Sequence, residues 1–319
     1  ANPLTSEIDI AEPSEALVRL LGGSDAMLFA GYAGVPGINS DEMLGKAARL
    51  ASAVGGALRH PRGRVVFSGC GTSGRLAHLI ARSLNHYLAR AHGVPLSPPR
   101  FDYLLAGKDA ALLLPQEQVE DQPTAGSADL EAWHAAAGLR DDDPVVVVGI
   151  SCGLSATYVA SMLQAALAHP SYTAVALGFN PVEAVKHVRV DNWAGSFYAV
   201  LRDMLSEAHA HHAIVLNPVA GPESIAGSSR ASAPPPTSAH AACGPRPRRF
   251  VDRWRLVCGH PAPACVLCAG MKGGSVTKII VESACTVGIH LAFAGAGAAS
   301  TGAGAGAATA AVDAAAIKR

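Results

Sequence analysis

Short apolar runs recur along the chain and alternate with longer segments whose apolar residues follow helical spacing. Runs bounded by small or polar residues are typical of buried strands, which we expect at 65–69, 101–105, 144–150, 173–178 and 213–217. Helices are expected at 14–21, 41–58 with Ser40 as N-cap, 75–88, 129–138, 157–168 and 196–212. Because strands alternate with helices, the pattern predicts an α/β fold. This is a parallel doubly wound sheet with helices on both faces, preceded by N-terminal helices over 5–58.

Two of the expected strands run into loops that are rich in glycine and hydroxyl side chains. The first loop reads Gly-Cys-Gly-Thr-Ser-Gly over 69–74, the second reads Ser-Cys-Gly-Leu-Ser over 151–155, and a helix follows each. Glycine permits a tight turn and a close approach to a ligand, and the free N–H groups at a helix start bind anions. Ligands of parallel sheets bind at the carboxyl ends of the strands. The sequence therefore predicts a phosphate site made by Gly71, Thr72, Ser73, Ser151, Gly153 and Ser155.

These loops differ from the two common nucleotide-binding loops. They lack the Gly-Lys-Ser/Thr ending of an ATP-binding P-loop and the glycine spacing of a dinucleotide-binding fold. Two simpler explanations stay open. Each loop can be an ordinary strand-to-helix turn without a ligand, and Ser155 can serve only as the N-cap of the helix that follows it.

Charged residues add candidates for sugar and phosphate contacts. Glu117 and Glu120 follow the strand at 101–105, where their carboxylates could accept hydrogen bonds from sugar hydroxyls or act as a general base. A solvated acidic loop is the alternative. Arg230 and Lys272 offer cations, since arginine binds phosphate through two N–H groups and lysine supplies a point charge. Simple surface solvation is the alternative for both.

Further segments, taken with the two loops, carry a resemblance to one protein family. These segments are 2–5, 18–26, 105–109, 117–121, 178–181, 216–223, 227–230 and 271–275. The chain resembles the sugar isomerase (SIS) domain family that contains glucokinase regulatory proteins and N-acetylmuramic acid 6-phosphate etherases. The resemblance covers 2–230 and 271 to about 282, and it is closer to the first SIS domain of the regulators.

The resemblance implies a fold, a ligand and partners. The fold is an SIS-type, flavodoxin-like three-layer α/β/α domain, and the ligand is a phosphorylated hexose or amino sugar of the fructose 6-phosphate type. Ser73, Ser151 and Ser155 are implied to contact the phosphate, and Glu117 and Glu120 to lie in the site. The regulators bind a hexokinase-type enzyme, so such a partner is expected. Single-domain relatives pair so that each subunit completes the site of the other, so a homodimer is expected if the segment 231–270 is absent from the protein. No cofactor is expected, and the role lies in carbohydrate metabolism.

The etherases supply the alternative function, that of a carbon–oxygen lyase releasing D-lactate. This elimination needs a base and an acid, and the etherases carry a glutamate in the helix after the first loop. Ser83 stands at that position here, and a serine is no comparable acid. The sequence therefore favours a regulator over an enzyme, with Glu117 and Glu120 as the catalytic candidates of an etherase.

The segment 231–270 interrupts the resemblance. It holds seven prolines, five arginines and one acidic residue without periodicity, whereas in the family the sequences around Arg230 and Met271 adjoin. We interpret it as a retained in-frame intron, because a splice joining those residues is compatible with the genetic code. A zinc site of Cys258, His260, Cys265 and Cys268 is the alternative. The expected organisation is a helical segment at 1–58, one SIS domain at 59–230, this insert, a terminal SIS helix at 271–293 and a Gly/Ala-rich tail at 294–319.

Charge and cysteine content narrow the partners and the compartment. Lysine plus arginine and aspartate plus glutamate both number 25, so no net charge attracts nucleic acid or a membrane surface. The sequence shows no pattern of a secretory signal and no run of 18 strongly apolar residues, so neither export nor a membrane span is expected. Cys70 and Cys152, in the loops, suit free thiols in a reducing compartment. We expect a soluble cytoplasmic protein, and the resemblance adds the nucleus; the histidines show no metal spacing, so no metal is expected.

Overall fold

The computed structural model describes residues 12, 16, 23, 26–27, 29–32, 34–114, 116, 118–185, 187, 193–219 and 272–293; for 272–276 and 279 only the backbone is described. In this part of the chain one parallel sheet is present, with the strand order β2-β1-β3-β4-β5. Its strands are β1 (Arg64–Gly69), β2 (Phe101–Leu105), β3 (Val145–Ile150), β4 (Tyr172–Leu177) and β5 (Ala213–Leu216). The predicted parallel α/β fold is confirmed, and each expected strand agrees with the observed one to within one residue at either end.

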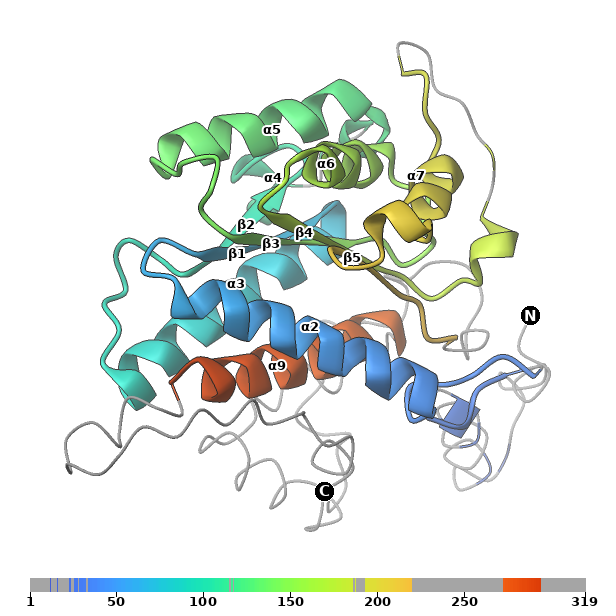
Figure 1. The fold of residues 1–319 in the computed structure, drawn as a ribbon. Helices are drawn as coiled ribbons and strands as arrows, with labels where there is room; N and C mark the ends of the chain where they lie inside the picture. Colours follow the sequence, from blue (N-terminus) through green and yellow to red (C-terminus); the bar gives the residue numbers. More distant parts are fainter. Residues whose placement is uncertain are drawn as a thin grey trace.

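Helices cover both faces of the sheet and make a three-layer α/β/α domain (Figure 1). One layer holds α2 (Asp41–Arg59), α3 (Gly71–His92) and α9 (Lys272–Phe293). The other holds α5 (Pro123–Ala136), α6 (Thr157–Ala168) and α7 (Phe197–Met204), with the short α4 (Ala110–Leu113) beside them. Short 3₁₀ turns are η2 (Val119–Asp121), η3 (Val182–Ala184) and η4 (Glu207–His209).

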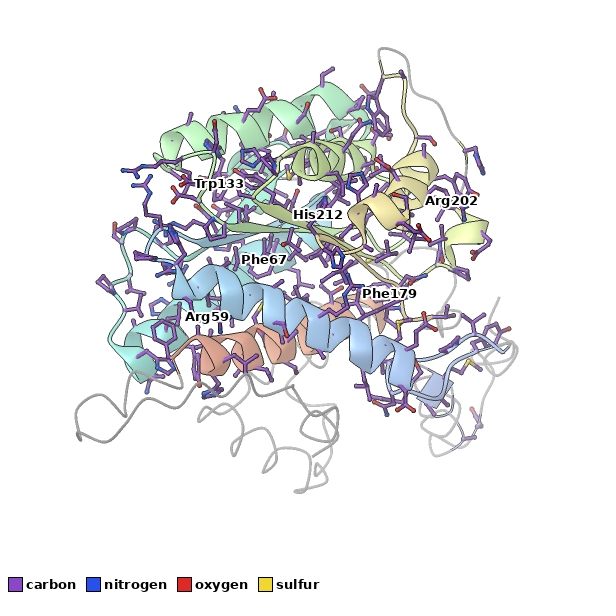
Figure 2. All side chains as sticks on the ribbon, in the orientation of Figure 1. Arg59, Phe67, Trp133, Phe179, Arg202 and His212 are labelled. Carbon is purple, nitrogen blue, oxygen red and sulfur yellow. The ribbon has the colours of Figure 1, made fainter. Side chains whose placement is uncertain are left out.

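The strands divide the core into two apolar clusters because successive side chains point to opposite faces of the sheet. Phe67 packs in the cluster on the α2, α3 and α9 side, while Val66 belongs to the cluster on the α6 and α7 side. Figure 2 shows Phe67 below the sheet and Trp133 of α5 above it. The core is thus made largely of small and aliphatic side chains that fill both layers.

Helix α9 follows 220–271 in the chain and lies against α2 (Figure 1). The two helices approach closely at Gly55 and Gly288, since a Cβ atom on Gly288 would lie 2.7 Å from the carbonyl oxygen of Ala51. Buried side chains of α9, among them Val281, Cys285 and Ile289, complete the core of this layer. A terminal helix of the domain was expected at 271–293, and the structure describes α9 at Lys272–Phe293, packed in the same layer as α2 and α3.

Several helix boundaries differ from the expected ones. The helix expected at 75–88 begins at Gly71, because the small loop residues form its first turn, and the helix expected at 129–138 begins at Pro123, a favoured first residue. The Ser40 cap of α2 is confirmed, since its Oγ accepts a hydrogen bond from the N–H of Met43 at 3.3 Å. The amphipathic segment 14–21 lies outside the described residues except for Ala16, which is helical.

Two helical predictions were wrong. Residues 31–32 and 34–40 are not helical, because glycines and Pro36 interrupt the pattern and Tyr32 pairs with Val35 in an isolated bridge. The helix expected over 196–212 ends at Met204. Beyond it the chain turns, and His209 contacts the Asp203 carboxylate at 3.4 Å and the His212 ring at 2.9 Å. The histidines at 209, 211 and 212 therefore do not share one helix face.

Candidate functional site

The two glycine- and serine-bearing loops follow β1 and β3, which are neighbours at the centre of the sheet. With the strand order 2-1-3-4-5, the chain leaves these two strands toward opposite helical layers. The carboxyl ends of β1 and β3 therefore form the switch point at which open α/β sheets bind ligands. We refer to residues 69–74 as the first loop and to 150–156 as the second loop.

The first loop is a tight turn directly into α3. Cys70 is its N-cap in an extended conformation, and its carbonyl oxygen accepts hydrogen bonds from the N–H groups of Ser73 at 3.0 Å and Gly74 at 3.3 Å. A Cβ atom on Gly74 would lie 2.6 Å from the carbonyl oxygen of Gly69, so the turn requires glycine. Gly71, Thr72 and Ser73 thus form the first turn of a long helix. The Ser73 N–H is bonded to Cys70, so the N–H groups of Gly71 and Thr72 are the ones that a helix start offers to a ligand.

The second loop is organised by the Ser151 side chain. Ser151 is buried, and its Oγ accepts hydrogen bonds from the N–H groups of Ser155 at 3.2 Å and Ala156 at 3.4 Å. Because this hydroxyl oxygen accepts both bonds, its own proton remains available to donate. The N-cap of α6 is Ala156, with no side-chain cap, so the alternative that Ser155 serves as the N-cap is wrong.

Leu154 folds the second loop back onto the domain. Its backbone is left-handed, with φ of 52°, a conformation that leucine rarely adopts, and its side chain is fully buried. That side chain fills the space above Gly178, where any Cβ atom would overlap it. The loop therefore carries backbone strain that the packing of Leu154 offsets, and Gly153 and Ser155 are left exposed at its tip.

The two loops meet, and the acidic turn η2 joins them. Ser73 Oγ lies 3.7 Å from Cys152 Sγ, which connects the start of α3 to the second loop. Thr157 Oγ1 at the start of α6 donates to the carbonyl oxygen of Glu120 at 3.2 Å. Burial, and after it the negative charges of Glu120 and Asp121, raise the pKa of the Cys70 thiol to about 12. The thiol is therefore neutral at physiological pH, and η2 lies close to the first loop.

The structure thus brings together most of the residues predicted for the site, and some lie outside its described part. Brought together are Gly71, Thr72, Ser73, Ser151, Gly153, Ser155 and Glu120. Glu117 and Arg230 lie outside the described residues, as do the four candidate zinc ligands of 231–270. Lys272 begins α9, and its side chain also lies outside them. Within the described ranges no group of three or more histidine, cysteine or acidic side chains is placed to hold a metal ion.

Three polar residues beside the second loop were not predicted. Asn180 Nδ2 donates to the carbonyl oxygen of Gly153 at 3.1 Å, and Asn217 Nδ2 donates to the carbonyl oxygen of Asn180 at 3.4 Å. Lys46 Nζ of α2 then donates to Asn217 Oδ1 at 3.3 Å. Asn-Pro follows both β4 and β5 in the sequence, and this repeated dipeptide at neighbouring strand ends was the signal that could have found the two asparagines.

The groups at this edge are of the kinds that bind an anion and a polyol. The start of α3 and the Ser151 hydroxyl provide neutral donors. Glu120 of η2 carries a carboxylate, a group that accepts hydrogen bonds. Ser83, at the position of the etherase acid, lies exposed on α3. No helix in the described part of the chain combines the length and apolarity needed to cross a bilayer.

This fold, a five-stranded parallel sheet between two helical layers, is that of an SIS-type α/β domain, and comparison with known proteins specifies its type. Residues 49–167 match the family model described as the glucokinase regulatory protein N-terminal SIS domain. The chain is 36% identical to the glucokinase regulatory protein of Xenopus laevis over 289 residues, which are 89% of this chain and 39% of the relative. The human glucokinase regulatory protein is 35% identical over 289 residues, again 89% of this chain and 38% of the relative. The chain therefore carries an SIS domain of the glucokinase regulatory protein type.

A weaker similarity links the chain to bacterial etherases. The N-acetylmuramic acid 6-phosphate etherase of Enterobacter sp. (strain 638) is 31% identical over 189 residues, which are 59% of this chain and 51% of the relative. The expected family and its closer likeness to the regulators are confirmed. The chain spans about two fifths of the length of the regulatory proteins that it matches, as the shares of 39% and 38% show.

Proposed function

We propose that the carboxyl edge of the sheet binds a phosphorylated hexose or amino sugar of the fructose 6-phosphate type. The observation that carries this proposal is the meeting of two helix starts through the Ser73–Cys152 contact, with the buried Ser151 hydroxyl able to donate beside them. Backbone N–H groups and hydroxyls bind a phosphate dianion without the desolvation cost of a buried cation. The Glu120 carboxylate, on the turn η2 near the first loop, is proposed to accept hydrogen bonds from the sugar hydroxyls.

Residues beyond the described part extend this proposal. Glu117 is proposed to act with Glu120 on the sugar, and Arg230 and Lys272 are proposed to supply positive charge to the phosphate. An arginine fork and a lysine ammonium would neutralise a dianion that the neutral loop donors only partly compensate. The hydroxyl side chains then fix the geometry, while the cations set the strength of binding.

The proposed role is regulatory rather than catalytic. The similarity to glucokinase regulatory proteins supports a hexokinase-type enzyme as partner, with the phosphosugar altering that interaction. We place the protein in the cytoplasm, with the nucleus as a second location, and propose a homodimer in which each subunit completes the site of the other. The balanced charge of 25 basic and 25 acidic residues supports neither a nucleic acid nor a membrane as partner.

Titration calorimetry with the full chain tests the ligand. Fructose 6-phosphate is expected to bind, whereas fructose, which lacks the phosphate, gives no heat under the same conditions. If inorganic phosphate gave heat and fructose 6-phosphate gave none, the site would bind the anion and not the sugar. If no phosphosugar binds, the ligand proposal is wrong. Hexokinase activity measured with and without the protein, in the presence of fructose 6-phosphate, then tests the partner.

We also propose that 231–270 is a retained intron. Its composition departs from the rest of the chain, and its removal joins Arg230 directly to Met271. Sequencing spliced transcripts tests this, because an mRNA lacking the corresponding 120 nucleotides is expected, three for each of forty codons. If every transcript retains them, the segment belongs to the protein. The calorimetric and hexokinase assays are therefore repeated with a variant lacking 231–270.

A further inference from the structure

The second loop is attached to the end of β4 by three successive hydrogen bonds. Ser151 N–H donates to the carbonyl oxygen of Leu177 at 2.9 Å, and Phe179 N–H donates to that of Cys152 at 2.9 Å. The third bond runs from Asn180 Nδ2 to the carbonyl oxygen of Gly153 at 3.1 Å. It is the one of the three that a side chain makes, so a substitution can remove it without changing the backbone.

Gly153, which accepts the Asn180 hydrogen bond, is the residue of the second loop with the widest backbone freedom. Glycine has wide backbone freedom, Gly153 is exposed, and the next residue, Leu154, has the unfavourable left-handed backbone. Rotation of the peptide after Gly153 would change the direction of Leu154 and move Ser155 relative to Ser151. Both ends of this peptide are held: the Gly153 carbonyl oxygen accepts from the Asn180 side chain at 3.1 Å, and the Leu154 N–H donates to the Ser151 carbonyl oxygen at 2.9 Å.

Asn180 is itself connected to the opposite helical layer. Its carbonyl oxygen accepts from Asn217 Nδ2 at 3.4 Å, and Asn217 Oδ1 accepts from Lys46 Nζ at 3.3 Å. Lys46 also forms an ion pair with Glu42 at 2.8 Å, one turn earlier on α2. A continuous chain of polar contacts thus runs from α2, past the ends of β5 and β4, to the second loop. Phe179, which precedes Asn180, lies on this edge between the sheet and α2 (Figure 2).

We propose that Asn180 is a positioning residue of the phosphosugar site, which presets the Ser151–Ser155 loop through its bond to Gly153. This inference rests on the proposed function and adds a residue that acts without touching the ligand. Asn217 and Lys46 hold Asn180 from the other side. Their contribution is smaller, because the bond from Asn180 to Gly153 survives when they are removed.

Two variants of the full chain test this role. Asn180→Ala is expected to weaken binding of fructose 6-phosphate about tenfold in calorimetry, the loss typical of one hydrogen bond. If inorganic phosphate binds to the parent, its affinity is expected to fall by the same factor, because both ligands depend on the loop. Asn217→Ala removes a contact on the other side of Asn180 and keeps the bond to Gly153, so a smaller loss of affinity, about twofold, is expected. The thermal midpoint of ligand-free Asn180→Ala stays within about 2 °C of the parent, which separates positioning from a general loss of stability.

Amide hydrogen exchange gives a readout that needs no ligand. In Asn180→Ala, exchange in peptides covering 150–156 is expected to accelerate about tenfold, while peptides covering 69–74 keep the parent rate. If the parent binds no phosphosugar, the proposed function fails, and this exchange result still decides whether Asn180 holds the loop. Unchanged affinity and unchanged exchange in Asn180→Ala would overturn the inference, and so would equal acceleration in both loops.

Discussion

The two edges of the sheet are built from different chemistry. At the carboxyl edge, the loops after β1 and β3 present glycines and the hydroxyls of Ser73, Ser151 and Ser155. At the amino edge, arginines dominate. Arg100 donates to the carbonyl oxygens of Leu58 at 2.9 Å, His60 at 2.7 Å and Gly63 at 2.9 Å. The difference teaches that buried charge stabilises the amino edge of this domain, while the described loops of the carboxyl edge present mostly neutral donors.

The charged side chains at the amino edge form hydrogen bonds and ion pairs within the domain itself. Asp143 is buried and accepts from Arg62 Nε at 2.7 Å and from the N–H of Arg140 at 2.7 Å. Burial, and after it the positive charge of Arg64, lowers the pKa of Arg100 to about 10, so the guanidinium remains charged at neutral pH. A search for phosphate sites by clustered arginines would therefore point to the end of the strands opposite the proposed site.

The largest effect is expected at the carboxyl edge, from Gly74→Ala. The new Cβ atom would lie 2.6 Å from the carbonyl oxygen of Gly69 and would overlap the Leu105 side chain, so the turn into α3 must open. We expect a loss of about 3 kcal/mol in the free energy of unfolding, measured by urea denaturation. Gly56→Ala on α2 is the control, because nothing lies within 4 Å of its Cβ position, and alanine there leaves stability unchanged or raises it by up to about 1 kcal/mol.

The amino edge is tested by Asp143→Asn. This change removes the negative charge of the carboxylate that accepts hydrogen bonds from Arg62 and Arg140. It is expected to lower the free energy of unfolding by about 2 kcal/mol. Affinity for fructose 6-phosphate stays within about twofold of the parent, because the substitution lies at the far end of the strands. Asp142→Asn, at an exposed neighbour, is expected to change neither quantity. A large loss of affinity in Asp143→Asn would contradict the separation of the two edges.

Ser151→Ala sharpens the comparison within the carboxyl edge. It removes the acceptor for two N–H groups and the proposed phosphate donor, so affinity for fructose 6-phosphate should fall about tenfold and stability by about 1 kcal/mol. Ser73→Ala is the matched variant, since the Ser73 N–H already bonds to Cys70 and its Oγ makes a weak contact with the Cys152 sulfur at 3.7 Å. It is expected to weaken binding with little change in stability. Unchanged affinity in Ser151→Ala, measured by calorimetry, would remove Ser151 from the site.

Acid should affect the amino edge in a defined direction. Burial alone would raise the pKa of Asp143, but hydrogen bonds from Arg62 and Arg140 and the positive charges of Arg62 and His60 outweigh it and lower the pKa below 3.8. A carboxyl group with a lowered pKa contributes stability that is fully present above its ordinary pKa and is lost as the pH falls through the folded value. Urea unfolding from pH 6 to about pH 3 should therefore show a steeper loss for the parent than for Asp143→Asn. Parallel curves for the two proteins would refute this assignment.

The strands were predictable because buried parallel strands are almost continuously apolar, and the turn residues after them are conspicuous. The helix starts were not, since Gly71, Thr72 and Ser73 look like loop residues although they form the first turn of α3. The hydroxyl residues of the site could be predicted because each lies in a short local motif. The Asn180–Gly153 and Lys46–Asn217 contacts could not, because they join residues 27 and 171 positions apart and depend on the finished sheet.

The smallest effect is expected in an assay for etherase activity, where the parent should release no D-lactate from N-acetylmuramic acid 6-phosphate above background. Ser83 lies exposed on α3, and an alcohol is too weak an acid to protonate a departing ether oxygen near neutral pH. Loss of a general acid lowers the rate by about 10² to 10⁴. The Enterobacter etherase serves as the positive control. D-lactate release by the parent that Glu120→Gln abolishes would show that the carboxyl edge is catalytic and that the lyase is the correct class. Release by Ser83→Glu alone would show instead that the edge keeps the remaining machinery and lacks only the acid.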